Sequence, residues 1–414
     1  MSLRTRVLES IAEVDAGRWN ALLRRPSPPV GGASGEPAMA PAIPPAAGAE
    51  PFLRHEFLLA LEESGCTSAR SGWAPRHLLL ETPEGALKAA LPLYRKSHSR
   101  GEFVFDFAWA NAYQQYGLRY YPKLVSAVPF TPVSGPRLLL DPLAAAPERR
   151  TLGAALVRAA MEQARAARLS SWHVLFPSDE SLGLLKDAQL IERLDCQFHW
   201  HNRGYESFDA FLATFTAEKR KKAKRERRRV SEAGIRFETR FGAELDAPLW
   251  RRLFEFYADT FYRHGHEPYL NLRFFQRIAE QLAERLMLKI AYQGAEPIAV
   301  AIFFVGDEAL YGRYWGAGGQ YHSLHFETCY YQGIDFCIER GLQRFEPGTQ
   351  GEHKVPRGFV PVITASVHDI VDARFAAAIR DYALREAHGV ERYAAAVNEH
   401  VPYHRAPGDE ELRL

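Results

Sequence analysis

The segment LKIAYQGAEPIAVAIFFV, residues 288–305, decides the fold class, because two apolar runs flank a Gly-Ala-Glu-Pro turn. This pattern predicts a β-hairpin. Residues 77–94, HLLLETPEGALKAALPLY, repeat it around a Pro-Glu-Gly turn. A strand-like segment follows each hairpin (EFVFDFAW and EALYGRYW), and an apolar helix with a closing strand comes later in each half. Two copies of this order, about 200 residues apart, predict two domains of one mixed α/β design rather than a solenoid.

The composition is typical of a globular protein with a sizeable core. The 414 residues are 47% apolar and 25% charged, which suits two domains, expected at residues 1–200 and 201–414. A formal net charge of +2 excludes a chain that is polycationic throughout. The four cysteines form no CxxC pair, which argues against a disulfide framework and a zinc knuckle. Because no run of 18 apolar residues and no leader-like start occurs, we expect a cytoplasmic protein without a transmembrane segment.

One segment is of low complexity. Residues 26–49 consist almost entirely of Pro, Ala, Gly and other small residues, with very few bulky apolar side chains. Such a composition cannot form a packed core. We therefore expect a disordered insertion within the first domain.

The order of elements in each half resembles the GNAT acyltransferase fold, and the pairing of two such units resembles the FemAB-like, peptidoglycan-related N-acyltransferases. Four segments carry the resemblance: residues 91–124, 128–139, 324–362 and 366–370, the last reading SVHDI. The resemblance covers most of residues 51–390. It implies tandem GNAT-like domains, each a mixed, mostly antiparallel sheet flanked by helices. It also implies transfer of an acyl or aminoacyl group to an amine, such as that of a cell-envelope precursor.

The resemblance further implies acyl-CoA or aminoacyl-tRNA as co-substrate, with no tightly bound cofactor. The glycines of RYWGAGGQ lie at a strand-to-helix crossing, where GNAT proteins hold the pyrophosphate of the carrier, although the usual Q/R-x-x-G-x-G/A spacing is missing. Gly316, Gly318 and Gly319 are the predicted cofactor-binding residues. A plain flexible turn is the alternative.

Acyl transfer to an amine needs a base, because the amine must lose a proton, and a donor for the tetrahedral oxyanion. His325 and Glu327, at the start of a predicted helix, are candidates for a base and its positioning partner, and Tyr330 for the oxyanion donor. In the alternative interpretation Glu327 complements the helix dipole and His325 belongs to a polar rim. Their spacing does not favour a metal site, and none is predicted.

The stretch GTQGEHKVPRGF, residues 348–359, is expected to be extended and to follow a strand, with Glu352 and Lys354 on one face. Glu352 is a further catalytic candidate, and a solvated loop with internal ion pairs is the alternative. The predicted substrate-binding residues come from this stretch, from the preceding strand and helix, and from an aromatic cluster in the first half, where packing is the other explanation: Gln350, His353, Lys354, Arg357; Tyr314, Trp315, Tyr331; Trp109 and Tyr113.

Positive charge is concentrated in a predicted helix over residues 208–233. Nine of the eleven residues at 219–229 are Lys or Arg, which favours a polyanionic partner over an indifferent surface. Lys219, Lys221, Lys222, Arg225 and Arg228 are the predicted polyanion-binding residues. Aminoacyl-tRNA, an anionic membrane surface or a coenzyme A tail would each suit them. The second hypothesis is therefore a non-catalytic protein that binds RNA or an anionic precursor. The sequence does not indicate the oligomeric state.

Overall fold

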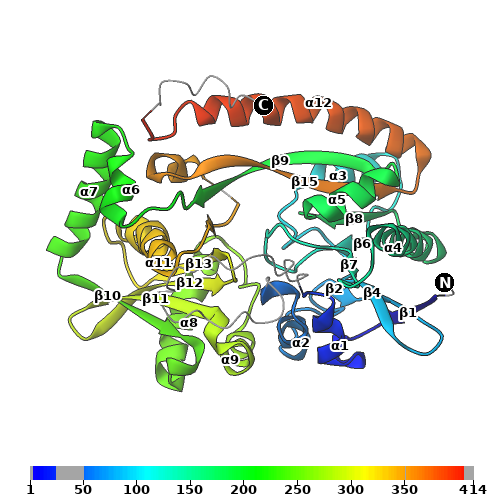
Figure 1. The fold of residues 1–414 in the computed structure, drawn as a ribbon, viewed down its shortest axis with the longest axis horizontal. Coiled ribbons are helices and arrows are strands. Elements are labelled where there is room, and N and C mark those ends of the chain that lie inside the picture. Colours follow the sequence, from blue (N-terminus) through cyan, green and yellow to red (C-terminus); the bar gives the residue numbers. More distant parts are fainter. Residues whose placement is uncertain (1–2, 25–50, 350, 405–414) are drawn as a thin grey trace, which may run out of the picture. The chain divides into compact units, whose positions relative to one another are not determined.

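The computed structural model describes residues 3–24, 51–349 and 351–404 (Figure 1). The predicted insertion at 26–49 and the candidate Gln350 lie outside the described residues. The chain divides into two compact units. Unit 1 comprises Met1–Leu194, Tyr269–Leu282 and Thr364–Ala387, and unit 2 comprises Asp195–Pro268, Ala283–Ile363 and His388–Leu414.

These units differ from the expected division at residue 200, because two later segments pack with the first unit. One of them contains helix α9 (Leu272–Gln281), which packs on α2 (His55–Glu63). The rings of Phe57 and Phe274 meet there edge to face, with centroids 5.5 Å apart. Apolar periodicity predicts such a helix but not the partner on which it packs.

Unit 1 contains two sheets. In the first, β1 (Arg4–Leu8), β3 (His77–Glu81), β4 (Leu87–Leu91) and β7 (Leu139–Leu140) are neighbours in that order and antiparallel. The second contains β2 (Trp73–Pro75), β5 (Tyr94–Lys96), β6 (Lys123–Ser126), β8 (Ser171–Leu175) and the Ser366–Ile370 part of β15 (Val360–Ile370). Only the β6–β8 pair is parallel among these.

The helices of unit 1 surround these sheets. They are α1 (Ala16–Ala21), α2, α3 (Phe107–Gln115), α4 (Ala146–Ala166), α5 (Asp179–Asp187) and α9. Helix α4 contributes to the core through an apolar face that includes Leu152 and Leu156 and packs against β3, β4 and β8. The predicted hairpin at 77–94 is the β3–β4 pair.

In unit 2 the strand order is β10 (Ile235–Phe241), β11 (Leu286–Gln293), β12 (Glu296–Val305), β13 (Ala309–Ala317), β14 (Arg344–Glu346) and β9 (Ile191–His201). The β11–β12 pair is the predicted hairpin at 288–305, and β13–β14 is the one parallel pair among these strands. Both units are thus mixed, mostly antiparallel sheets flanked by helices, and the predicted fold class is confirmed.

The helices of unit 2 are α6 (Phe208–Ala213), α7 (Ala217–Glu232), α8 (Ala247–Arg263), α10 (Leu324–Phe326) and α11 (Gln332–Arg340), and α12 (Ala373–Asn398) continues from unit 1 into unit 2. The predicted single helix at 208–233 is divided into α6 and α7. The break occurs because Phe215 forms a β-bridge with Tyr403, and the Thr216 amide donates to the carbonyl of Pro402.

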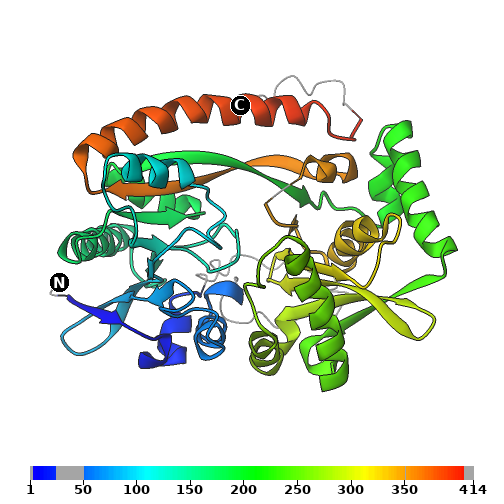
Figure 2. The same ribbon diagram turned by 180° about the vertical axis from the view of Figure 1, so that it is seen from behind.

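Helix α8 packs directly on β12 and β13, as the view from behind shows (Figure 2). A Cβ atom at Gly316 of β13 would lie 2.0 Å from the backbone oxygen of Phe256 in α8. One at Gly318 would lie 2.8 Å from the Phe256 ring. The close approach of helix and strand therefore explains Gly316 without a carrier phosphate.

Candidate functional site

A cavity of about 120 Å³ in unit 2 lies where β12 and β13 are distorted. The pairing shifts between Ile302–Tyr314 and Phe303–Gly312, so Arg313 is an extra residue that forms a β-bulge. Four of the predicted site residues line this bulge cavity, together with Arg313 and Cys329 among others: Tyr314, Trp315, His325 and Tyr330. Bulges re-aim side chains and are common beside active sites.

The helix that closes the cavity is itself irregular. Between α10 and α11, residues Glu327–Tyr331 form a π-helical turn. Such single turns occur often at functional sites, because the wider turn displaces side chains from the regular helical positions. Here Cys329 and Tyr330 of this turn contribute to the wall of the bulge cavity.

Tyr330 connects the cavity to two histidines. Its hydroxyl is 2.8 Å from Nε2 of His353, and the ring of His325 lies edge-on at 5.4 Å between centroids. His325 also meets Trp315 at 5.4 Å and His353 at 6.1 Å. Burial, with the positive charges of His353, Arg357 and Lys354, lowers the pKa of His325 to about 4. Burial raises the pKa of Tyr330. At neutral pH, His325 is therefore an uncharged imidazole and Tyr330 an intact hydroxyl.

The two cations near His325 and Tyr330, Lys354 and Arg357, bind to other residues of the protein. Lys354 is buried, and its Nζ donates to the carbonyl of Gly348 at 2.7 Å. Burial lowers the pKa of Lys354 to about 7, with a further contribution from Arg313. Arg357 donates to Oε1 of Glu226 at 2.7 Å and lies over the ring of Phe326. Lys354 and Arg357 were predicted to bind substrate, but in the structure both are buried and hydrogen-bonded to residues of unit 2.

The prediction that the stretch 348–359 is extended is wrong. Residues Glu352–Arg357 form a 3₁₀ helix. Gly351 and Gly358 bracket it with φ angles of 107° and 95°, which favour glycine. Successive residues on such a turn point in different directions, so Glu352 is exposed whereas Lys354 is buried. The Glu352 carboxylate accepts a hydrogen bond of 2.8 Å from Tyr393. Glu352 and Lys354 do not share the face on which the prediction placed them.

Glu327 faces a different space from His325. It lines a groove of about 390 Å³, hereafter the α7 groove, with Arg227, Arg228, Val230, Ser231, Ile235, Phe237 and Gln332. Residues two apart on a helix do not share a face. His325 and Glu327 therefore line separate cavities, and the predicted base and positioning pair is not assembled.

Three further predicted residues are buried in packing contacts. Tyr331 donates its hydroxyl to Oε2 of Glu226 at 2.7 Å. In unit 1, Trp109 packs edge-on against His368 at 4.8 Å, and Tyr113 lies 4.0 Å from Phe375 between ring centroids. For Trp109 and Tyr113, these contacts agree with the alternative interpretation of the aromatic cluster, in which its residues serve packing and do not bind substrate.

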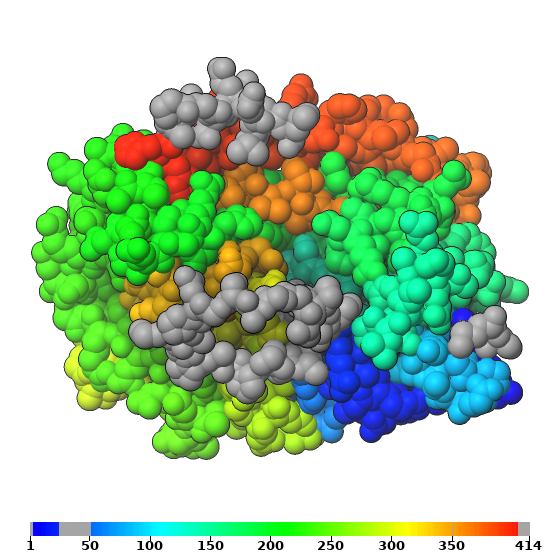
Figure 3. Space-filling model, viewed as in Figure 1, coloured from blue at the N-terminus to red at the C-terminus, as the bar shows by residue number. Residues whose placement is uncertain are grey.

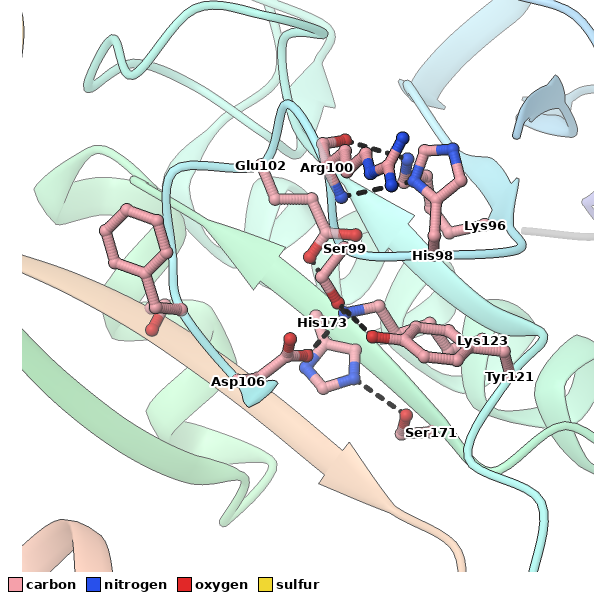
Figure 4. Close-up of polar contacts among 12 residues, drawn as sticks. Lys96, His98, Ser99, Arg100, Glu102, Asp106, Tyr121, Lys123, Ser171 and His173 are labelled. Carbon is pink, nitrogen blue, oxygen red and sulfur yellow. Dashed lines mark hydrogen bonds and ion pairs between the residues drawn. The ribbon is translucent and has the colours of Figure 1, made fainter. Parts of the chain in front are cut away.

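Unit 1 holds a buried polar cluster around Lys123 that the sequence did not reveal as a site (Figure 4). Nζ of Lys123 donates to Oγ of Ser99 at 2.9 Å, to Oε2 of Glu102 at 2.8 Å, and to Asp106. Asp106 accepts in addition from the hydroxyl of Tyr120 at 2.5 Å. We call these five residues the Lys123 cluster. All of them are buried, and each one is hydrogen-bonded to another member.

Two histidines extend the Lys123 cluster. Nε2 of His173 lies 2.7 Å from Oγ of Ser171 and 3.3 Å from the Tyr120 hydroxyl. Nδ1 of His173 is 2.5 Å from Nδ1 of His368, whose own pKa burial lowers to about 3. Burial raises the pKa of Glu102 to about 7. This arrangement can hold and pass protons between buried groups. The signal in the sequence was a polar residue within an apolar strand, as in SWHVL and SVHDI.

Helix α7 lies at the surface (Figure 3), and its basic residues are exposed or half-buried. Lys221, Lys222, Arg225 and Arg228 are exposed, and Lys219 is half-buried. The inner face of α7 presents Ala223, Glu226 and Val230, which are buried. Because Glu226 bonds both Tyr331 and Arg357, a buried carboxylate holds this cationic helix to unit 2.

The described residues contain no group of three or more His, Cys, Asp or Glu side chains that could hold a metal ion. Within the same residues, every helix is too short or too polar to span a membrane.

Comparison with known proteins finds a family and several solved structures. The model of the FemAB-like family, described as peptidoglycan biosynthesis/recognition, matches residues 10–405. No curated protein matches. One similar structure is the C-terminal domain of a putative lysylphosphatidylglycerol synthetase from Agrobacterium fabrum, with 11% identity, 90% of this chain and 96% of that chain covered, and a TM-score of 0.49. The structure of FemX has 11% identity, with 77% of this chain and 93% of that chain covered, and a TM-score of 0.46. A tandem GNAT protein from the clavulanic acid biosynthesis pathway has 10% identity, with 89% of this chain and 98% of that chain covered, and a TM-score of 0.43.

Proposed function

This chain belongs to the FemAB-like family, and we propose that it is an N-acyltransferase whose chemistry takes place in the bulge cavity of unit 2. The observation that carries the proposal is the position of the Tyr330 hydroxyl. Tyr330 lines the cavity, its hydroxyl hydrogen-bonds His353, and the uncharged ring of His325 lies against it. A hydroxyl donor next to two imidazoles meets the needs of acyl transfer to an amine.

The reaction forms a bond between the amine nitrogen and the acyl carbon, and breaks the bond from that carbon to the oxygen or sulfur of the carrier. His353 takes up the proton that the amine releases. Tyr330 gives its proton to the leaving oxygen or sulfur, and His353 returns a proton to Tyr330 across the 2.8 Å hydrogen bond. Because the pKa of His325 is about 4, His325 orients the amine as a hydrogen-bond acceptor and does not store its proton.

The proposed donors are acyl-CoA or aminoacyl-tRNA, and the proposed acceptor is an amine on a cell-envelope precursor. Both donors carry phosphates, and the exposed cations of α7 support a polyanionic carrier. The same surface favours the second candidate function, a protein that binds RNA or an anionic precursor without catalysis. Substitution of Tyr330 distinguishes the two candidate functions. An acyltransferase should lose turnover without the Tyr330 hydroxyl, whereas a protein that only binds has no turnover to lose.

The test is product formation by the purified full chain. It is incubated with acetyl-CoA or with an aminoacyl-tRNA and a muropeptide that bears a free amine, and the products are analysed by mass spectrometry. In Tyr330→Phe we expect turnover to fall by about 10²- to 10⁴-fold, the range for loss of general acid–base assistance.

The matched control is Tyr331→Phe, which also removes one buried hydroxyl from the same helical turn. Tyr331 bonds Glu226 and does not line the bulge cavity. This variant should lose stability but keep its turnover per folded molecule. Equal turnover in Tyr330→Phe and wild type would refute the assignment of Tyr330. Product formation by neither donor, together with tight tRNA binding, would favour the binding protein.

A further inference from the structure

The α7 groove has the features of a ligand site separate from the bulge cavity. Its volume of about 390 Å³ falls within the range of about 300 to 1,000 Å³ that is usual for small-molecule sites. Its lining combines apolar side chains (Val230, Ile235 and Phe237) with charged groups of both signs. The proposed acyl transfer makes no use of this groove, so the inference below does not depend on it.

Glu327 supplies an unsatisfied acceptor to the groove. Its Oε1 accepts hydrogen bonds from Nε of Arg227 at 3.2 Å and from Gln332 at 2.8 Å. Its Oε2 is buried and has no hydrogen-bond partner among the described residues. The residue as a whole is 3% exposed. A buried carboxylate oxygen without a donor costs free energy, and a donor from a ligand in the groove would recover it.

The charges around Glu327 favour a cation as that donor. Arg227 is shared between Glu327 and Asp335, with nitrogen-to-oxygen distances of 3.1 and 2.6 Å. Lys289, which is also buried, interacts electrostatically with Glu339, Asp335 and Glu327. Three carboxylates thus face two cations. An ammonium group at Oε2 of Glu327 would balance the remaining negative charge.

Arg228 offers the opposite charge at the rim of the same groove. Its side chain is 68% exposed, and its ion pair with Glu232 is long, at 3.8 Å. Such an exposed pair contributes little, so the guanidinium remains available to a carboxylate.

We propose that the α7 groove binds a zwitterionic α-amino acid with an apolar side chain. The ammonium group donates to Oε2 of Glu327, the carboxylate accepts from Arg228, and the side chain packs on Val230, Ile235 and Phe237. The ligand in this site is the protonated amino acid, so the site is one of recognition and involves no bond making.

The experiment uses the full chain and three probes in isothermal titration and ligand-detected NMR. L-Leucine has both charges, L-leucinamide lacks the carboxylate, and N-acetyl-L-leucine lacks the ammonium. We expect wild type to bind L-leucine best and N-acetyl-L-leucine worst. The same affinity for L-leucine and N-acetyl-L-leucine, or no binding of any probe at millimolar concentration, would overturn the proposal.

Two variants assign the two charges. Glu327→Gln should weaken binding of L-leucine by about 10- to 100-fold, the effect of losing a hydrogen bond to a charged group. Arg228→Gln should bind L-leucine no better than L-leucinamide. Glu284→Gln is the matched control, because Glu284 is exposed, does not line the groove and is not one of the carboxylates around Arg227 and Lys289. Arg228 is exposed and its replacement does not threaten folding, so its result decides even if Glu327→Gln fails to fold. Unchanged selectivity in Arg228→Gln would exclude the proposed orientation.

Discussion

At the scale of single residues, the Lys123 cluster places one ammonium between two carboxylates in the core of unit 1. Replacing Lys123 by Met removes the cation and leaves Glu102 and Asp106 buried side by side. Breaking a buried ion pair by removing one partner typically costs about 3–5 kcal/mol, because the remaining charge is uncompensated. We therefore expect urea unfolding of Lys123→Met to show a loss of stability of about that size.

Lys88→Met is the control for this variant. Lys88 pairs with Asp141 at 2.8 Å, but both side chains are partly exposed, and exposed pairs contribute about 0–1 kcal/mol. A loss in Lys123→Met no larger than that in Lys88→Met would mean that the buried pair contributes little.

Single residues of the candidate site were predicted where a motif was local. His325, Tyr330, Tyr314 and Trp315 lie within 17 residues of sequence and meet in one cavity. Glu327 lies in a different cavity from His325, because side chains two residues apart on a helix point in different directions. The two histidines that extend the Lys123 cluster were missed for the opposite reason: His173 and His368 are 195 residues apart in the chain. One sequence without an alignment does not indicate which distant polar residues meet.

At the scale of elements, α7 exposes most of its cations to solvent and is anchored on its inner face by Glu226. Replacing Lys221, Lys222 and Arg225 with Gln should weaken binding of tRNA. The slope of log affinity against log salt should decrease by about 2 to 3 units, since each phosphate contact contributes about 0.7 to 0.9. Filter binding at several salt concentrations measures this. Arg228 stays unchanged in the variant because it lines the α7 groove.

The control for α7 is replacement of Arg251 and Arg252, two exposed cations of α8, which should leave the slope nearly unchanged. Absence of tRNA binding by wild type at low salt would exclude aminoacyl-tRNA as the donor.

Elements with a strong period were predicted better than irregular ones. The hairpins at 77–94 and 288–305 follow from apolar runs around turn residues, and both are present. The bulge at Arg313, the π-helical turn at Glu327–Tyr331 and the 3₁₀ helix at Glu352–Arg357 were not predicted. Each depends on how the segment packs on its neighbours, and these three irregular elements supply or adjoin the walls of the bulge cavity.

At the scale of the whole molecule, the repeated order of elements predicted two similar units, but not which segments complete each one. Boundaries between the two units fall inside β9, β15 and α12. Because unit 1 consists of three separate segments, the chain leaves it and returns to it twice. A linear division at residue 200 cannot represent such a path, because local periodicity contains no information about which distant segment will cover an apolar face.

Each unit also contains a buried lysine, and together they make stability depend on pH. Burial lowers the pKa of both Lys96 in unit 1 and Lys354 in unit 2 to about 7, from 10.5 in the unfolded chain. A lysine with a lowered pKa contributes stability that is complete above the unfolded pKa and is lost as the pH falls through the folded pKa. Between about pH 7.5 and 8.5 the unfolded chain therefore binds more protons than the folded chain, and stability rises by about 1.4 kcal/mol per pH unit for each lysine. In urea unfolding at several pH values, Lys96→Met and Lys354→Met should each remove one such increment from the slope, whereas Lys88→Met should keep it. A slope that is the same in wild type and in both variants would show that these amines are already protonated in the folded protein at pH 7.5 to 8.5.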